Sequence, residues 1–255
     1  MSSVLGVDVC RGAWVGILLD PDPHPVGGGD GDVSSAARVG IVHGLFAERV
    51  ADLVAEAESR ASGGLAVIGI DIPIGLPDVG RRKADGLARA LLGPRAASVF
   101  PVPVRAAVEE PDHPRASSLN VALAGVGISR QSHGLRTAIL DVDGWLRSRV
   151  AGGTGAGPVV VEVHPELSFA TLAGAPLRHG KRSWSGVEQR RLLLDGAGIA
   201  VPVDLGLAGS RAAPDDVLDA AVVAWTARRV AAGTASSYPE PPERFSDGLD
   251  AAIRA

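Results

Sequence analysis

The stretch Leu65-Ala-Val-Ile-Gly-Ile-Asp71-Ile-Pro73 contains the clearest strand signal of the chain. Residues 65–70 are almost all apolar, which is typical of a central strand that is buried on both faces and runs parallel to a neighbour. The strand ends at a charged residue, Asp71, and two prolines, Pro73 and Pro77, follow it. Helical patterns lie on both sides of this strand, so the sequence predicts an α/β fold.

On the N-terminal side, residues 45–60 have apolar side chains on one side of a predicted helix and charged side chains on the other. Three strands are predicted before this helix, over residues 4–9, 13–19 and 38–43. Because no helix separates these strands, we expect them to be antiparallel neighbours. The Gly/Pro/Asp stretch 21–32 is predicted to be a loop.

On the C-terminal side, helices are predicted around residues 81–92, 114–124 and 131–147, and a fifth strand over 159–163 follows a linker at 151–157. The last long helix is predicted to begin at Pro214, because proline is favoured at a first helical position. The sequence contains no internal repeat. We therefore expect one α/β domain over residues 1–255, with a helical insertion at roughly 79–150.

The composition excludes several classes of protein. The chain has 255 residues, of which 46% are hydrophobic and 21% charged, as in soluble globular proteins. Its single cysteine, Cys10, excludes an internal disulfide framework and a cysteine-rich zinc cluster, and it fits a cytoplasmic location. Asp8 and Arg11 interrupt any signal peptide, and no apolar run reaches the roughly 18 residues of a membrane span. The net charge of -4 excludes a strong attraction of the whole protein to nucleic acid but not a local basic lining.

Acidic residues end several of the predicted elements. Asp8, Asp71 and Glu162 stand at or near strand ends, and Asp216 and Asp219 share one face of the last helix. Ligand groups gather at the carboxyl ends of parallel strands in an open α/β sheet. Carboxylates grouped there would repel one another unless a cation shared the site. Mg²⁺ or Mn²⁺ suits such oxygen ligands, and two ions about 4 Å apart can clamp a phosphodiester during hydrolysis.

Several of these acidic residues also have a structural interpretation. Asp215 and Asp216 fall in the first turn after Pro214, where carboxylates often bind free backbone N–H groups. Asp8 could begin the turn at Arg11-Gly12, and Asp71 could bind loop amides. Asp219 lies past the first turn, so a capping role does not apply to it.

The same residues carry a resemblance. Leu5-Gly-Val-Asp8, Ile68-Gly-Ile-Asp71 and Asp216-Val-Leu-Asp219 follow the order of acidic motifs in the ribonuclease H-like superfamily. More closely, the chain resembles the domain of unknown function 429 family, whose members are described as predicted RNase H-like nucleases. The resemblance covers nearly the whole chain and rests on Asp8-Val-Cys-Arg-Gly-Ala-Trp-Val-Gly, Asp71-Ile-Pro-Ile-Gly-Leu-Pro, Asp85 with Arg89, Ser98-Val-Phe-Pro, Gln131, Glu162-Val-His-Pro-Glu166, Lys181 and Asp215-Asp-Val-Leu-Asp-Ala.

The resemblance implies a fold and an activity. The fold is an RNase H-like mixed sheet of five strands, three antiparallel and then two parallel, flanked by helices. The activity is metal-dependent hydrolysis of the phosphodiester bonds of DNA or RNA. Asp8, Asp71 and Asp219 correspond to the ligands of Mg²⁺ or Mn²⁺, and Asp216 lies one turn before Asp219. Superfamily nucleases often carry glutamate where this chain has the shorter Asp71.

Further candidates surround this site. His164 shares a face with Glu162 on an extended chain and could orient water or protonate a leaving oxygen, or it could simply fix a loop. Both residues are counted with the catalytic candidates. The predicted substrate-binding residues are Arg11, Arg89 and Lys181, which match family positions, and Trp184, which lies in a polar loop and is a candidate for base stacking.

Two other classes of function compete with the nuclease. A phosphotransferase or ATPase of the actin-like kind also begins with a Gly-x-Asp strand, but the chain has no glycine-rich phosphate loop and no second copy of the domain. A non-catalytic protein could use the same acidic pocket to bind a nucleotide or a partner protein. The sequence does not distinguish DNA from RNA and does not indicate the oligomeric state.

Overall fold

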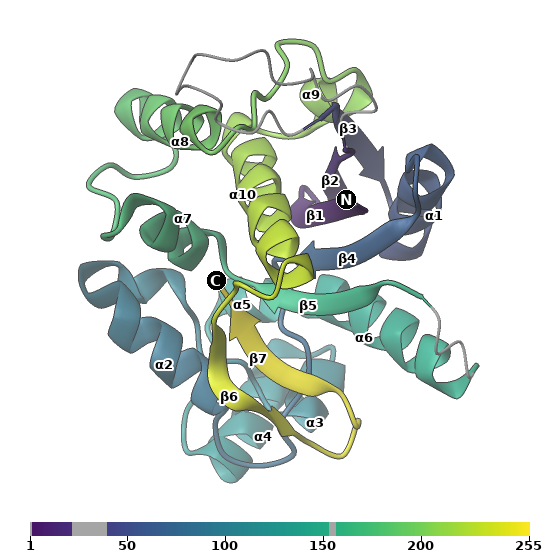
Figure 1. The fold of residues 1–255 in the computed structure, drawn as a ribbon. Helices are drawn as coiled ribbons and strands as arrows, with labels where there is room; N and C mark the ends of the chain where they lie inside the picture. Colours follow the sequence, from purple (N-terminus) through teal and green to yellow (C-terminus); the bar gives the residue numbers. More distant parts are fainter. Residues whose placement is uncertain (1, 22–39, 153–156) are drawn as a thin grey trace, which may run out of the picture.

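The computed structural model describes residues 2–21, 40–152 and 157–255. It shows a mixed α/β fold, in which helices flank a sheet of seven described strands (Figure 1). The strand order is β3-β2-β1-β4-β5-β7-β6. The strands are β1 (Ser3–Cys10), β2 (Ala13–Leu19), β3 (Val42–Ala47), β4 (Leu65–Ile70), β5 (Val159–Val163), β6 (Ser237–Arg244) and β7 (Asp250–Arg254).

The sheet is partly parallel. β1 pairs antiparallel with β2, and β2 pairs antiparallel with β3, whereas β4 runs parallel to both β1 and β5. The predicted number of five strands is wrong, because β7 pairs parallel with β5 and β6 pairs antiparallel with β7. β6 was not predicted from the sequence, because Pro239, Pro241 and Pro242 have no backbone N–H to donate to a neighbouring strand. β6 lies at the edge of the sheet, where a strand tolerates proline.

The predicted boundary between the third strand and the first helix is also wrong. β3 spans Val42–Ala47, so Leu45 and Phe46 belong to a strand, and α1 begins at Val50. Leu45 pairs with Gly16 of β2 and is buried, which explains its apolar character without a helix. Residues 38 and 39 of the predicted strand, residues 22–32 of the predicted loop and residues 153–156 of the predicted linker lie outside the described residues.

Six of the helices pack in two groups on opposite faces of the sheet. One core joins the sheet to α7, α8, α9 and α10, and the other joins it to α1 and α6. The helices are α1 (Val50–Arg60), α2 (Lys83–Leu92), α3 (Arg105–Glu109), α4 (His113–Ala124), α5 (Arg130–Gly134), α6 (Arg136–Ala151), α7 (Pro165–Ala173), α8 (Trp184–Gly196), α9 (Leu207–Arg211) and α10 (Pro214–Ala231), with a 3₁₀ helix η1 (Gly93–Ser98).

α10 packs against the backbone of the two central strands. Gly6 of β1 faces Ala220 and Ala224, and Gly69 of β4 faces Val223. Because glycine has no side chain, it permits such a close approach between a helix and a strand. This contact fixes the position of α10, which lies across β1 and β4 in Figure 1.

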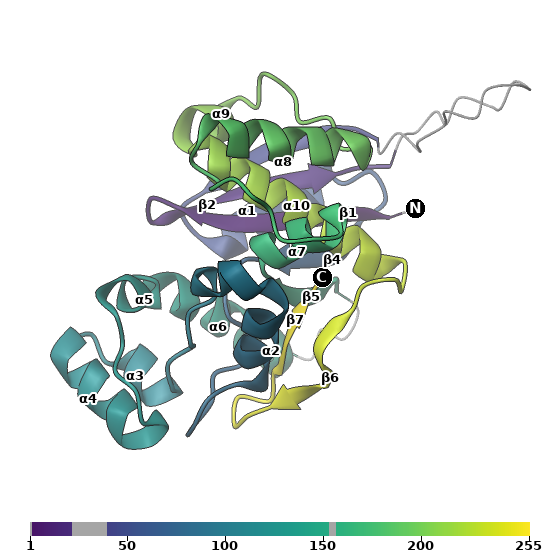
Figure 2. The same cartoon turned by 90° about the vertical axis from the view of Figure 1, so that its left-hand side faces the viewer.

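The chain between β4 and β5 is mostly helical and runs from α2 to α6. α6 packs on the sheet, whereas α3 and α4 lie to one side of it (Figure 2). α3 and α4 pack against each other around a small separate core, which contains Val104, Ala107, Ala116 and Ile128.

Among the described residues, no helix has both the length and the apolar character that a membrane crossing requires.

Candidate active site

Asp8 and Asp71 lie at the carboxyl ends of two neighbouring parallel strands. Asp71 follows β4 directly, and its backbone N–H donates a hydrogen bond to Val7 O of β1 (2.9 Å). Because side chains alternate along a strand, Asp8 lies on the same face as Gly6, and Asp71 continues the face of Gly69. Both glycines contact α10, so the two carboxylates lie on the side of the sheet that α10 covers.

α10 adds a third carboxylate to this site. Asp219 precedes Ala220, whose backbone rests against Gly6, so the contact that seats the helix also brings Asp219 over the end of β1. The Asp219 side chain is only 3% exposed. The three predicted metal ligands, Asp8, Asp71 and Asp219, thus come together from two strand ends and one helix.

Burial and mutual repulsion raise the pKa values of all three carboxylates. Burial raises the pKa of Asp8 well above its usual value, and the charges of Asp71 and Asp219 raise it further. Burial, followed by the charge of Asp219, raises the pKa of Asp71 to about 8. Burial raises the pKa of Asp219 to about 6, although Lys181 acts in the opposite direction. The cluster therefore attracts protons or cations at neutral pH.

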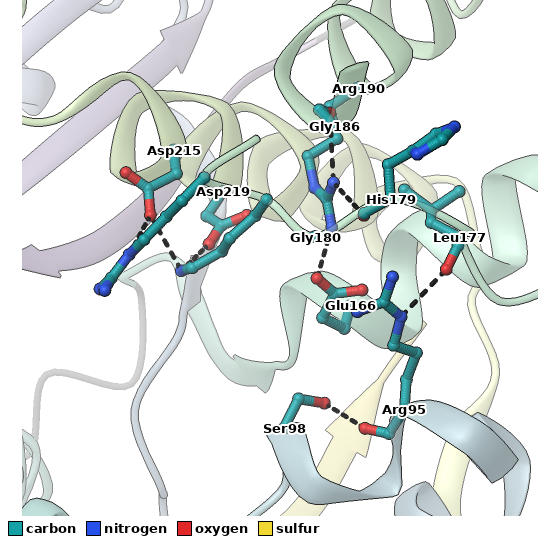
Figure 3. Close-up of polar contacts among 12 residues, drawn as sticks. Arg95, Ser98, Glu166, Leu177, His179, Gly180, Gly186, Arg190, Asp215 and Asp219 are labelled. Atoms are coloured by element: carbon teal, nitrogen blue, oxygen red, sulfur yellow. Dashed lines mark hydrogen bonds and ion pairs between the residues drawn. The ribbon is translucent and has the colours of Figure 1, made fainter. Parts of the chain in front are cut away.

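Lys181 is the cation of this cluster in the structure. Its Nζ lies 2.6 Å from Asp219 Oδ2 and 3.9 Å from Asp215 Oδ2. Figure 3 labels these two carboxylates. Burial lowers the pKa of Lys181, but the charges of Asp219, Asp8 and Asp71 outweigh that effect and raise it. The other oxygen of Asp219, Oδ1, is buried and has no hydrogen-bond partner among the described residues.

The first turn of α10 contributes Asp215 and Asp216. Asp215 is buried and accepts a hydrogen bond from Arg182 Nε (3.3 Å), so its carboxylate pairs with cations of the loop before α8. Asp216 is half-buried, and burial raises its pKa, as does the charge of Asp215. A hydrogen bond with the backbone of Ala213 lowers it. Asp216 therefore makes the predicted contact at the start of the helix and also lies near the carboxylate cluster.

Glu162 is held in a buried ion pair. Arg82 donates to both of its carboxylate oxygens (2.7 and 2.8 Å), and Ile74 N donates to Glu162 Oε2 (2.7 Å). The same guanidinium binds Asp85 Oδ1 (2.6 Å). Burial lowers the pKa of Arg82, but the charges of Glu162 and Asp85 outweigh this effect and raise it. Glu162 adds negative charge near Asp71 while its own oxygens are engaged.

His164 caps a helix. Its Nδ1 accepts a hydrogen bond from Leu167 N at the start of α7 (3.4 Å), and its Nε2 lies 3.3 Å from Ser98 O. These contacts assign the proton to Nε2. Burial lowers the pKa of His164, so the ring is neutral at pH 7. Of the two roles considered from sequence, these contacts are those of a residue that fixes a loop.

The predicted substrate-binding residues lie in different environments. Arg11 is exposed in the turn between β1 and β2, with a positive φ of 50°. Arg89 donates to the carbonyl groups of Ala96 and Val99 and so supports η1. Trp184 is the first residue of α8 and is 79% exposed.

The chain matches one family model, and the match spans most of its length. The model is described as "Protein of unknown function (DUF429)" and covers residues 6–244. The chain belongs to this family. The matched segment contains Asp8, Asp71, Lys181 and Asp219, so the whole cluster lies within the family region. No curated protein and no solved structure matches the chain.

In the structure, the ammonium group of Lys181 contacts Asp219 and lies near Asp8 and Asp71. Within residues 2–21, 40–152 and 157–255, no three His, Cys, Asp or Glu side chains are arranged as a ready metal-binding group. The donor chemistry nevertheless fits a hard divalent cation, since all three side chains offer oxygens and Asp219 Oδ1 lacks a partner. An ion would require the carboxylates to close around it and Lys181 to leave Asp219.

Sequence reasoning missed two buried arginines near the site. Arg82 was interpreted as part of the solvent-exposed charged run 81–83, and nothing in the sequence around Arg190 indicated that its side chain is buried. Arg190 is fully buried and pairs with Glu166 of α7. Its Nη1 also donates to His179 O (3.3 Å), two residues before Lys181. The prediction considered each residue by its neighbours in sequence, whereas these ion pairs join residues that are far apart in the chain.

Proposed function

We propose that this protein is a metal-dependent phosphodiesterase that acts on nucleic acid, with Asp8, Asp71 and Asp219 as the ligands of Mg²⁺ or Mn²⁺. The observation that carries the proposal is the convergence of the carboxylates of buried Asp8, buried Asp219 and partly buried Asp71 at the carboxyl ends of β1 and β4 under α10. Such a group of negative charges is costly to maintain unless cations share it. It is also the usual location of a ligand site in an open α/β sheet.

The strand order supports an RNase H-like core within this fold. The run β3-β2-β1-β4-β5 has antiparallel pairs among the first three strands and parallel pairs from β1 to β5. This is the pattern expected of the superfamily, and the β7-β6 pair extends it beyond β5. Helices α2 to α6 would then be an insertion between the fourth and fifth strands of a single domain.

In this proposal the residues of the site have different roles. A bound divalent ion would supply an activated water and offset charge on the phosphodiester oxygens. Asp8, Asp71 and Asp219 would hold it. Lys181, once away from Asp219, would face the substrate phosphate as a point charge. Asp216 is half-buried and can exchange protons with solvent.

A nuclease assay titrated with Mn²⁺ tests the proposal. Single-stranded and duplex DNA and RNA serve as substrates, and ATP hydrolysis is measured in parallel. We expect Asp8→Asn and Asp219→Asn each to abolish cleavage while retaining the fold, because each change removes one charged ligand and preserves shape. Asp215→Asn should have a much smaller effect, and Asp52→Asn, at an exposed position of α1, is the neutral control. Unchanged cleavage in the first two variants would refute the assignment.

One observation favours a second candidate function. Because Lys181 already neutralises Asp219, the same residues would also suit a non-catalytic protein that binds a nucleotide or a partner. Binding of a nucleotide without hydrolysis of either nucleic acid or ATP would support that function.

A further inference from the structure

Residues 181–184 begin with a lysine that contacts the carboxylate cluster and continue with an exposed arginine and an exposed tryptophan. Lys181 reaches into the cluster and contacts Asp219. The Arg182 side chain is 86% exposed, and the indole of Trp184 begins α8 with 79% of its surface exposed. A cation at the site, a second cation at its edge and an exposed aromatic ring therefore follow one another within four residues.

The exposure of Trp184 is not explained by the fold. The chain contains four tryptophans, and the other three are packed. Trp14 is buried and donates to Asp141 (2.9 Å), while Trp145 and Trp225 are partly buried under the guanidinium groups of Arg149 and Arg229. Burial of an indole ordinarily stabilises a protein, so the Trp184 indole, left in solvent three residues after Lys181, is free to contact a ligand.

The backbone that carries Trp184 is held firmly. Ser183 caps α8 by accepting a hydrogen bond from Gly186 N (3.1 Å), and Ser183 N donates to Gly180 O (3.0 Å). A side chain at Gly186 could not fit, because its Cβ would lie 1.9 Å from Gly180 O. The fully buried Arg190 of α8 donates a hydrogen bond to the carbonyl oxygen of His179, the residue before Gly180, and so holds this segment against α8 (Figure 3). The ring is thus presented from a fixed position, which lowers the entropic cost of binding.

The partner of Arg182 leaves it available. Its Nε lies 3.3 Å from Asp215 Oδ2, but the guanidinium side of this pair is 86% exposed and screened by solvent, and Asp215 also has Lys181 Nζ at 3.9 Å. A phosphate group offers a guanidinium two oxygens in a matching geometry. Arg182 can therefore turn from Asp215 to a phosphate at little cost, one position from Lys181 and two from Trp184.

We propose that residues 181–184 form a platform for unpaired nucleotides, on which Trp184 stacks a base and Arg182 binds the adjoining phosphate. The substrate class is single-stranded nucleic acid. A base must expose its face to stack on an indole, and bases inside a duplex do not. This inference rests on the proposed function, since Lys181 would then hold the next phosphate at the carboxylate cluster.

The experiment measures binding without cleavage. Oligo-dT of 15 nucleotides, a mixed-sequence single strand and a closed hairpin duplex of that sequence are each titrated in chelator, with tryptophan fluorescence and the anisotropy of a labelled strand as readouts. We expect both single strands to quench the fluorescence and to bind at least tenfold more tightly than the duplex. Trp184→Leu should abolish the quenching and weaken binding about tenfold, whereas Trp184→Phe should keep most of the affinity. Arg182→Ala should weaken binding and reduce its salt dependence.

Two variants on the same helix are matched controls. Arg191→Ala removes an equal charge, and Leu192→Ala removes an apolar side chain that is 69% exposed; both should bind like the wild type. The proposal is overturned if no single strand quenches the fluorescence, if duplex binds equally well, or if Trp184→Leu binds normally. It is also overturned if Trp184 instead mediates a dimer that Trp184→Leu dissociates in sedimentation.

The binding and cleavage measurements distinguish a failure of the platform from a failure of the proposed function. Single-strand binding that depends on Trp184, without cleavage in Mn²⁺, would retain the platform and remove the nuclease. Cleavage in Mn²⁺ that Trp184→Leu leaves unchanged, with normal binding, would retain the nuclease and remove the platform.

Discussion

A Cβ atom on Gly6 would lie 2.2 Å from the carbonyl oxygen of Ala220, so α10 rests on the bare backbone of β1. Asp219 is the neighbour of Ala220, and Asp8 lies two residues after Gly6 on the same face of the strand. The packing of the helix and the geometry of the carboxylate cluster are therefore one feature of the structure.

We predict that Gly6→Ala destabilises the protein by about 3 kcal/mol, because the added methyl group meets backbone atoms that cannot move without shifting α10. Urea denaturation measures the change. Gly86→Ala in the middle of α2 is the control, since a Cβ there meets nothing within 4 Å; it should be neutral or stabilise by up to about 1 kcal/mol. Equal stability of Gly6→Ala and wild type would contradict the close contact.

Much of this arrangement could be predicted from sequence. The strand 65–70 stood out as an apolar run, and the acidic residues Asp8 and Asp71 followed from strand ends alone. Asp219 was indicated by its position past the first turn of α10. These features are local, so periodicity and element ends are enough to find them.

The rest depended on tertiary contacts. β6 was missed because its prolines argue against a strand, and only its place at the sheet edge permits them. Glu162 resembled a catalytic residue because the sequence does not show that Arg82, 80 positions away, occupies both of its oxygens. Lys181 was predicted to bind substrate, but its contact with Asp219 depends on how the loop after α7 folds back onto α10.

We predict that Asp71→Asn stabilises the metal-free protein, and more at pH 9 than at pH 5. The pKa of Asp71 is raised from 3.8 to about 8 by burial and by Asp219. The folded protein therefore binds the proton more tightly than the unfolded chain, and stability falls as the pH rises from about 4 to 8. Asparagine does not titrate, so the variant escapes this loss, by something on the order of 1 kcal/mol.

Melting curves in chelator at the two pH values measure this difference, with Asp52→Asn as the control for an exposed aspartate. Mn²⁺ should raise the melting temperature of the wild type more than that of Asp71→Asn. If Asp71→Asn melts below the wild type at both pH values and neither protein responds to Mn²⁺, Asp71 is a scaffold residue.

We predict that Glu162→Gln destabilises the protein by about 3 kcal/mol. Arg82 has a side chain only 1% exposed, and loss of one partner's charge leaves a buried cation poorly compensated. Glu56→Gln removes the same charge from the exposed pair with Arg60 and should change stability by less than about 1 kcal/mol. Chemical denaturation compares the two. Normal stability of Glu162→Gln together with lost Mn²⁺-dependent cleavage would instead favour the catalytic role predicted from sequence.

We predict that Lys181→Met increases the affinity for Mn²⁺ about tenfold, a gain of about 1.4 kcal/mol. Lys181 Nζ already neutralises Asp219 through Oδ2, and the buried Oδ1 has no partner, so a metal ion that binds Asp219 competes with the ammonium for the charge of one carboxylate. Removal of the ammonium ends this competition and also the repulsion between two cations. In chelator the variant should melt at a lower temperature than the wild type, because Asp219 loses its partner, and Mn²⁺ should more than restore it.

Calorimetric titration with Mn²⁺ compares Lys181→Met with the wild type and with Lys83→Met, which alters the other lysine of the chain. Lys83 is 74% exposed and lies 4.0 Å from Glu243, so its loss should leave the affinity for Mn²⁺ unchanged. Equal affinity in all three proteins would mean that the ion binds away from Asp219. Weaker binding by Lys181→Met alone would mean that the lysine supports the ion site, for instance by holding Asp219 in place. Only tighter binding by that variant agrees with a lysine that competes with a metal ion for Asp219, because the ammonium is then the cation that the ion must replace there.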